Sequence, residues 1–170
     1  MILEPKKIIP LFGIQHGMTV LDIGSGVGFW AKPIADLVGA SGNVIAVDYH
    51  PEIIQRLNHD IVEMGMKHIH AITGDIHNLA DFPVKKYSCD KILLIRMGSV
   101  VHDVYTNSVI KLLDYVKGTG NIIVIDHLDY QSRLEKELEQ FSDQLEYQII
   151  PLVEERNNHF FGMSIRKKVD

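Results

Sequence analysis

One stretch decides the fold: Val20-Leu21-Asp22-Ile23-Gly24-Ser25-Gly26-Val27-Gly28-Phe29-Trp30. It places an apolar strand and an acid ahead of three alternate glycines, and a helical segment follows. Glycines at this spacing remove side chains from a strand-to-helix turn, so a ligand can lie against bare backbone. The turn leads into a helix N-terminus, where free N–H groups point outward. We therefore expect the wall of a nucleotide-like pocket at this turn.

The spacing of the glycines narrows the class of ligand. It is Gly-x-Gly-x-Gly, with Asp22 two residues ahead of the first glycine. The dinucleotide-binding fingerprint is Gly-x-Gly-x-x-Gly, in which the third glycine comes one residue later. The difference counts against a nicotinamide cofactor.

Composition sets the broad class of protein. The chain has 170 residues, of which 46% are apolar and 23% charged, so we expect a single globular domain over residues 1–170. No apolar run approaches the length of a membrane span, and the N-terminus lacks the apolar segment of a signal peptide. One cysteine, Cys89, fits a reducing cytosol, and a net charge of −5 offers no general field for nucleic acid. The sequence thus predicts a cytoplasmic protein without a membrane or nucleic-acid partner.

Short apolar strands alternate with helical segments, which is the pattern of crossover units and a mostly parallel sheet. The predicted strands are 18–23, 44–47, 68–73, 91–95 and 121–125. The predicted helices are 30–37, 51–64, about 103–115 (stopped by Gly118 and Gly120), and one that carries Leu134, Leu138, Phe141 and Leu145. The end of the chain differs, because 147–153 and 159–166 follow each other without a helix and predict an antiparallel hairpin.

Four acids lie at or beside the ends of predicted strands: Asp22, Asp48, Asp75 and Asp126. In open parallel sheets the ligand crevice lies outside those ends, so side chains from different loops converge there. The carboxylate of Asp48, 20 residues after Gly28, is suited to accept hydrogen bonds from two ribose hydroxyls. Asp75 could receive the exocyclic amine of an adenine. The alternative for each acid is to cap the helix that follows.

Several ordered motifs together resemble the class I S-adenosylmethionine-dependent methyltransferases, over residues 18–166. They are the glycine run, Ala46-Val47-Asp48, Thr73-Gly74-Asp75-Ile76, Cys89-Asp90-Lys91-Ile92-Leu93-Leu94 and the final hairpin. The resemblance implies an α/β fold: a three-layer α-β-α sandwich with a seven-stranded, mostly parallel sheet and an antiparallel C-terminal strand. It also implies S-adenosylmethionine as the cofactor.

The resemblance assigns roles to individual residues. The three glycines would line the methionine half of the cofactor, and Asp22 would hold the loop and face the cofactor amine. Asp48 would bind the ribose, and the residues after the fourth strand would lie near the sulfonium and the substrate. The cofactor-binding residues implied in this way are Asp22, Gly24, Ser25, Gly26, Gly28, Asp48, Tyr49, Asp75, Ile76, Arg96 and Met97.

Methyl transfer by in-line displacement needs a base only when the acceptor arrives protonated. His127 and His102 follow predicted strands and are the candidate catalytic residues, because histidine titrates near neutral pH. The alternative is a solvated loop histidine or a helix cap, and Asp103 is more simply a helix cap. His68 and His70 alternate on a strand expected at the sheet edge, so we interpret them as solvated and expect no metal site.

The leading hypothesis is therefore methyl transfer from S-adenosylmethionine to an unidentified acceptor, a small molecule. The alternatives are a nicotinamide-dependent Rossmann oxidoreductase and a cofactor-binding module without catalysis. Only a short segment precedes the first strand, and no insertion is long enough for a lid domain. We expect a substrate site that is either shallow or completed by a second subunit, which makes a homo-oligomer possible.

Overall fold

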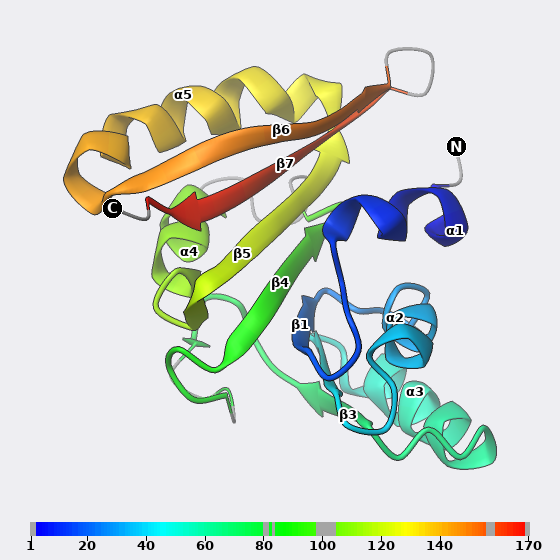
Figure 1. Ribbon diagram of the computed structural model, residues 1–170. Coiled ribbons are helices and arrows are strands. Elements are labelled where there is room, and N and C mark those ends of the chain that lie inside the picture. The colour runs from blue at the N-terminus through cyan, green and yellow to red at the C-terminus, as the bar shows by residue number, and fades with distance from the viewer. Residues whose placement is uncertain (1–2, 80–81, 83, 98–104, 156–158, 169–170) are drawn as a thin grey trace.

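A seven-stranded sheet with the strand order β3-β2-β1-β4-β5-β7-β6 forms the centre of the computed structural model (Figure 1). The structure describes residues 3–79, 82, 84–97, 105–155 and 159–168. The strands are β1 (Thr19–Ile23), β2 (Asn43–Asp48), β3 (Ile69–Thr73), β4 (Cys89–Ile95), β5 (Val116–His127), β6 (Tyr147–Glu155) and β7 (Phe160–Lys167). The helices are α1 (Pro5–Ile8), the short 3-10 helix η1 (Ile9–Phe12), α2 (Ala31–Val38), α3 (Pro51–Glu63), α4 (Tyr105–Leu112) and α5 (Leu128–Leu145).

The sheet is parallel from β3 to β5, and β7 runs antiparallel to both of its neighbours. This confirms the predicted sheet and the predicted C-terminal hairpin. It also places β3 at an edge, as expected. His68 lies just before β3, and its Nε2 is 2.9 Å from the carbonyl oxygen of Ala35, so that ring contacts the backbone of α2.

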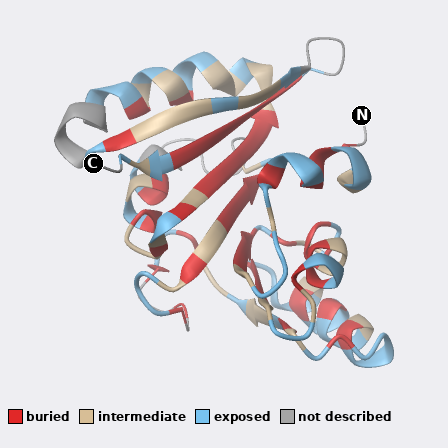
Figure 2. Ribbon diagram, viewed as in Figure 1, coloured by how far each residue is buried: buried red, intermediate tan, exposed pale blue. Residues whose placement is uncertain are grey.

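Two apolar cores cover the two faces of the sheet, which makes three layers. Alternate residues of β4 divide between them: Ile92 and Leu94 pack with α4 and α5, whereas Leu93 and Ile95 pack with α1, η1, α2 and α3. A strand buried on both faces must be apolar at every position, which explains the unbroken run that marks β4 in the sequence. Figure 2 shows the buried residues concentrated in the central strands.

The segment before β5 differs from the prediction. Gly118 and Gly120 were expected to stop a helix, but α4 ends at Leu112 and both glycines lie inside β5. The pairing of β4 with β5 shifts between Cys89↔Val116 and Lys91↔Asn121, so β5 carries extra residues there. A Cβ on Gly120 would lie 2.6 Å from the carbonyl oxygen of Asp90, so this glycine lets two backbones approach. A pattern of local stop signals could not reveal a close contact between strands.

Two predictions fall outside the described residues. His102 and Asp103 both belong to the segment 98–104, between β4 and α4. Their expected roles, as a base and as a helix cap, stay predictions.

Candidate functional site

A cavity of about 750 Å³ lies at the carboxyl ends of the parallel strands. Each of five neighbouring strands contributes to it: Asp75 follows β3, Asp48 ends β2, Gly24 follows β1, Arg96 follows β4 and His127 ends β5. This is the position at which open α/β sheets bind ligands. Its volume lies within the range of small-molecule and cofactor sites.

Backbone geometry explains the glycine loop between β1 and α2. Gly24, Gly26 and Gly28 have φ angles of 74°, 55° and 81°, a region that residues with a side chain rarely adopt. The amides of Gly24 and Ser25 both donate to the carbonyl oxygen of Val47, at 2.8 and 2.9 Å. The loop is thereby folded over the end of β2.

The three glycines have three different surroundings. A Cβ on Gly26 would meet nothing within 4 Å among the described residues, so this position opens into the cavity. A Cβ on Gly24 would collide with the side chain of Met97. A Cβ on Gly28 would lie 2.6 Å from Cδ1 of Leu57, so Gly28 permits the loop to pack against α3 and does not line the cavity.

Asp48 connects the loop to the cavity. Its Oδ2 accepts a hydrogen bond from the amide of Gly26 at 2.9 Å, and its Oδ1 accepts one from the amide of His50 at 3.0 Å. The ring Nδ1 of His50 is a further 3.2 Å contact of Oδ1. These bonds hold the carboxylate at the cavity wall, where its side chain is 11% exposed.

Asp22 lies beneath the loop, outside the cavity lining, with 1% of its surface exposed. Burial, with a smaller contribution from the charge of Asp48, raises the pKa of Asp22 to about 7. Within the described part of the chain, Asp22 Oδ2 and Ser25 Oγ are buried and have no hydrogen-bond partner. Buried polar atoms are almost always paired, so these two indicate a site built for a polar ligand.

The structure tests the helix-cap alternative for Asp75 and for His127. The Oδ1 of Asp75 accepts a hydrogen bond from the amide of His77 at 2.9 Å, and this forms a turn and caps no helix. His127 holds the N-cap position of α5, but its side chain makes no capping hydrogen bond and it lines the cavity. Trp30, at the end of the glycine loop, lines the cavity and also packs in the core, where it is 7% exposed.

The cavity includes most of the residues singled out in the sequence, and several that were not. Gly24, Ser25, Gly26, Asp48, Tyr49, Asp75, Ile76, Arg96, Met97 and His127 line it. Residues not predicted from the sequence include Val27, Phe29, His50 and His77. The two histidines each lie two residues after a strand-end acid whose carboxylate accepts their amide. That offset from an aspartate is the signal that would have found them.

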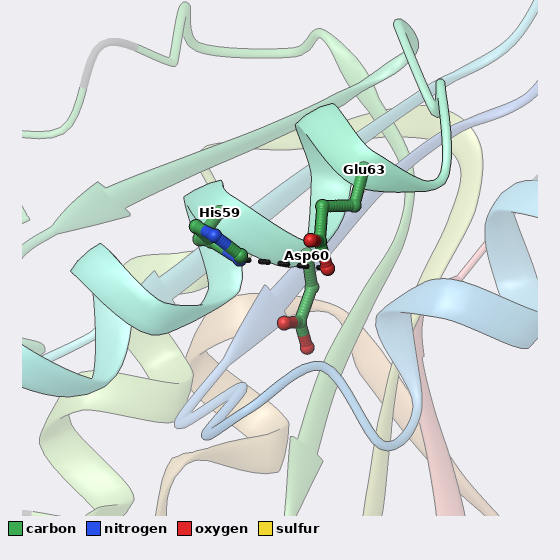
Figure 3. A group of neighbouring side chains, drawn as sticks. All are labelled: His59, Asp60 and Glu63. Atoms are coloured by element: carbon green, nitrogen blue, oxygen red, sulfur yellow. Dashed lines mark ion pairs between the residues drawn. The ribbon is translucent and has the colours of Figure 1, made fainter.

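One further group of polar side chains lies on α3, away from this cavity. The ligand atoms of His59, Asp60 and Glu63 lie within 4.8 Å of one another (Figure 3). Asp60 Oδ2 already pairs with Nζ of Lys32 at 2.5 Å, and His59 Nδ1 lies 3.6 Å from Glu63 Oε2 across one helical turn. These are the contacts of surface ion pairs, and we assign no metal to them.

Comparisons with known proteins agree on one family. A profile of the methyltransferase domain family matches residues 14–164. A protein-L-isoaspartate O-methyltransferase from Archaeoglobus fulgidus is 35% identical over 65 residues, which are 38% of this chain and 30% of that protein. The chain therefore matches less than a third of that relative's length.

Solved structures show the same fold. An S-adenosylmethionine-dependent methyltransferase from Aquifex aeolicus aligns with a TM-score of 0.76 and 21% identity, covering 95% of this chain and 88% of its own. Fibrillarin from Aeropyrum pernix, solved with natively bound S-adenosylmethionine, aligns with a TM-score of 0.69 and 16% identity, covering 89% and 67%. At such identities the likeness establishes the fold. Together with the profile, it shows that this chain belongs to the methyltransferase domain family and has the class I, Rossmann-like fold of S-adenosylmethionine-dependent methyltransferases.

Proposed function

We propose that the cavity binds S-adenosylmethionine and that the protein transfers its methyl group to a small-molecule acceptor. Asp48 binds the ribose, Asp75 and Ile76 contact the adenine, and the open backbone at Gly26 faces the methionine half. Asp22, below the loop, attracts the cofactor's ammonium group. The family membership and the placement of Gly26, Asp48, Asp75 and Ile76 around one cavity support this proposal.

The observation that carries the proposal is the carboxylate of Asp48. An ionised carboxylate has about four acceptor positions on its two oxygens. Oδ2 uses one of them for the amide of Gly26 and keeps another that can face a ribose hydroxyl. Oδ1 gains a free position when the ring of His50, 56% exposed, turns toward solvent. The carboxylate is thus fixed in place and can still accept hydrogen bonds from a sugar diol.

The unpartnered polar atoms fit the same ligand. Because Asp22 is buried and its Oδ2 lacks a partner within the described residues, a cationic amine nearby would offset part of its cost of burial. The space at Gly26 allows the ligand to reach the backbone without displacing a side chain. A nicotinamide dinucleotide fits less well, because the glycine spacing lacks the third glycine of its fingerprint.

The cofactor supplies a methyl group on a sulfonium, which is activated for displacement by a nucleophile. The protein's part is to hold donor and acceptor in line and to exclude water, which can supply much of the rate. His127, half-buried at the end of β5, is placed to accept a proton from an acceptor that arrives protonated. No covalent bond to the protein is required.

We expect Asp48→Ala to weaken the binding of S-adenosylhomocysteine at least tenfold, because two hydrogen bonds to a charged acceptor are lost. Calorimetric titration measures the affinity, and thermal unfolding shows whether the variant is folded. Asp36→Ala is the matched control, because Asp36 is an exposed acid on α2 outside the cavity. Equal affinities in all three proteins would contradict the ribose role.

We expect His127→Ala to lower turnover about 100-fold for a protonated acceptor, the usual range for a lost proton acceptor, and to leave cofactor affinity unchanged. The measurement is turnover of S-adenosylmethionine against a panel of compounds bearing hydroxyl, amine and thiol groups. Unchanged turnover in the variant would remove His127 from the mechanism. Cofactor binding without turnover of any compound in the wild-type protein would favour the non-catalytic module.

A further inference from the structure

The strand order arranges the polar groups of the cavity in a row. From one side to the other they are Asp75 after β3, Asp48 at β2, the glycine loop after β1, Arg96 after β4 and His127 at β5. Neighbouring strands lie about 4.8 Å apart, so Asp48 and the end of β4 are separated by two strand spacings, about 10 Å. A nucleoside held at β2 and β3 therefore leaves the ends of β4 and β5 for the other half of the reaction.

Arg96 is held in this row by its backbone. Its φ of 60° is unusual for a residue other than glycine, and its amide donates to the carbonyl oxygen of Ile125 at 2.7 Å. Such a conformation costs free energy and is concentrated at functional sites. Arg96 and His127 both line the cavity, at the ends of the neighbouring strands β4 and β5.

The guanidinium of Arg96 has no acidic partner among the residues described here. It lines the cavity and is exposed, yet no carboxylate of a described residue lies within ion-pair distance of it. The acids of the same cavity are already engaged: Asp48 with the amides of Gly26 and His50, and Asp75 with that of His77. A cavity that receives a sulfonium beside an unpaired guanidinium concentrates positive charge, and an anion between them relieves it.

We propose that the methyl acceptor is an anionic molecule whose carboxylate or phosphate group is bound by Arg96. The inference rests on the proposed methyl transfer and adds the class of acceptor. The planar fork of a guanidinium matches both groups with two parallel hydrogen bonds. Phe29 and Met97 line the same cavity and offer apolar surface to the body of the acceptor.

The anionic group bound by Arg96 is separate from the atom that is methylated. A guanidinium hydrogen-bonded to the nucleophilic atom would occupy the lone pairs of that atom and slow its attack on the methyl carbon. In the transfer, the bond between the nucleophile and the methyl carbon forms while the carbon–sulfur bond breaks, and the sulfur keeps the electron pair as a neutral thioether. A proton on the nucleophile leaves to His127 or to water. Arg96 therefore acts by positioning the acceptor.

The test measures anion binding to the protein saturated with S-adenosylhomocysteine, which prevents turnover. Benzoate and inorganic phosphate are titrated separately, so that the two kinds of anion are distinguished. We expect at least one to bind the wild-type complex, and Arg96→Gln to weaken that binding about tenfold or more, as expected for the loss of a charged bidentate contact. Arg96→Lys should retain part of the affinity, because it keeps the charge and loses the fork.

Arg56→Gln is the matched control, because it removes an exposed positive charge on α3 outside the cavity and should leave both affinities unchanged. The proposal is overturned if neither anion binds the wild-type complex, or if Arg96→Gln binds them as well as the wild type. A tenfold loss of S-adenosylhomocysteine affinity in Arg96→Gln would also overturn it, because the residue would then bind the cofactor's own carboxylate. Failure of the wild-type protein to bind S-adenosylhomocysteine at all would instead contradict the proposed function.

Discussion

Single residues in this protein have roles that a motif alone cannot distinguish. Gly24, Gly26 and Gly28 form one regular pattern in the sequence, and all three need a positive φ. The structure separates them by what surrounds each: a methionine side chain, open cavity and the buried Leu57 of α3. The pattern predicts the turn correctly, because the turn depends on backbone conformation. It could not predict the role of Gly28, because that depends on a helix that begins 23 residues later, at Pro51.

The strand-end acids show the opposite case. Of the four acids predicted at the ligand edge, Asp48 and Asp75 line the cavity, whereas Asp22 and Asp126 are buried and do not line it. The prediction succeeds for the first two because a parallel sheet brings its carboxyl ends together whatever the loops do. The conformation of Arg96 was not predictable, since a positive φ in a residue with a long side chain leaves no trace in the sequence.

Asp22 should make stability depend on pH. Its pKa is raised from 3.8 to about 7 by burial and then by Asp48, so the folded protein holds a proton that the unfolded chain releases above its ordinary pKa. The free energy of unfolding therefore falls as pH rises from about 4 to about 7, and this loss is complete above the folded-state pKa. Asp22→Asn, which cannot ionise, should flatten the fall.

The measurement is urea denaturation of both proteins at several pH values between about 4 and 8. Relative to the wild type, Asp22→Asn should gain stability toward the alkaline end of the series. A constant difference between the two proteins across the series would show that Asp22 keeps its ordinary pKa in the fold.

At the scale of elements, the irregular start of β5 gives a direct comparison between two glycines of one strand. A Cβ on Gly120 would lie 2.6 Å from the carbonyl oxygen of Asp90 and 3.0 Å from that of Cys89. A Cβ on Gly118 would meet nothing within 4 Å in the part of the chain that is described. Backbone atoms of a central strand cannot move aside as a flexible side chain can.

We expect Gly120→Ala to lower the free energy of unfolding by about 1–3 kcal/mol, because the added methyl group forces β4 and β5 apart. Gly118→Ala is the matched control and should stay within about 0.5 kcal/mol of the wild type. Chemical denaturation of the three proteins makes the comparison. Equal losses of stability in both variants would contradict this explanation, because only Gly120 lies close to the backbone of β4.

At the scale of the whole molecule, the order of elements was predictable and their exact limits were not. Apolar strands alternating with helices specify a parallel sheet, and the polar stretch near residues 154–158 specifies the hairpin that closes it. The limits of β5 depend on its pairing with β4, and the two cores depend on which helices reach which face. These are contacts between distant segments, which local patterns do not record. None of the helices in the described part of the chain combines the length and the apolar character of a membrane-spanning helix.

Ligand binding should be visible in the stability of the entire fold. A ligand that binds the folded state alone, at 100 times its dissociation constant, stabilises it by about 2.7 kcal/mol. For a chain of this size the midpoint of thermal unfolding should rise by roughly 5–10 °C. We expect this rise with S-adenosylmethionine and no rise with NAD at the same concentration. A rise with NAD alone would restore the oxidoreductase hypothesis.

The row of polar groups along the sheet also separates two parts of the chain. In the proposed function, the nucleoside lies against Asp48 and Asp75 at the ends of β2 and β3, and the acceptor lies near Arg96 and His127 at the ends of β4 and β5. Substitutions at the ends of β4 and β5 should therefore change which compound is methylated and leave the binding of the nucleoside unchanged. A change of acceptor in such a protein would then need substitutions only near the ends of two strands, and the rest of the fold would stay as it is.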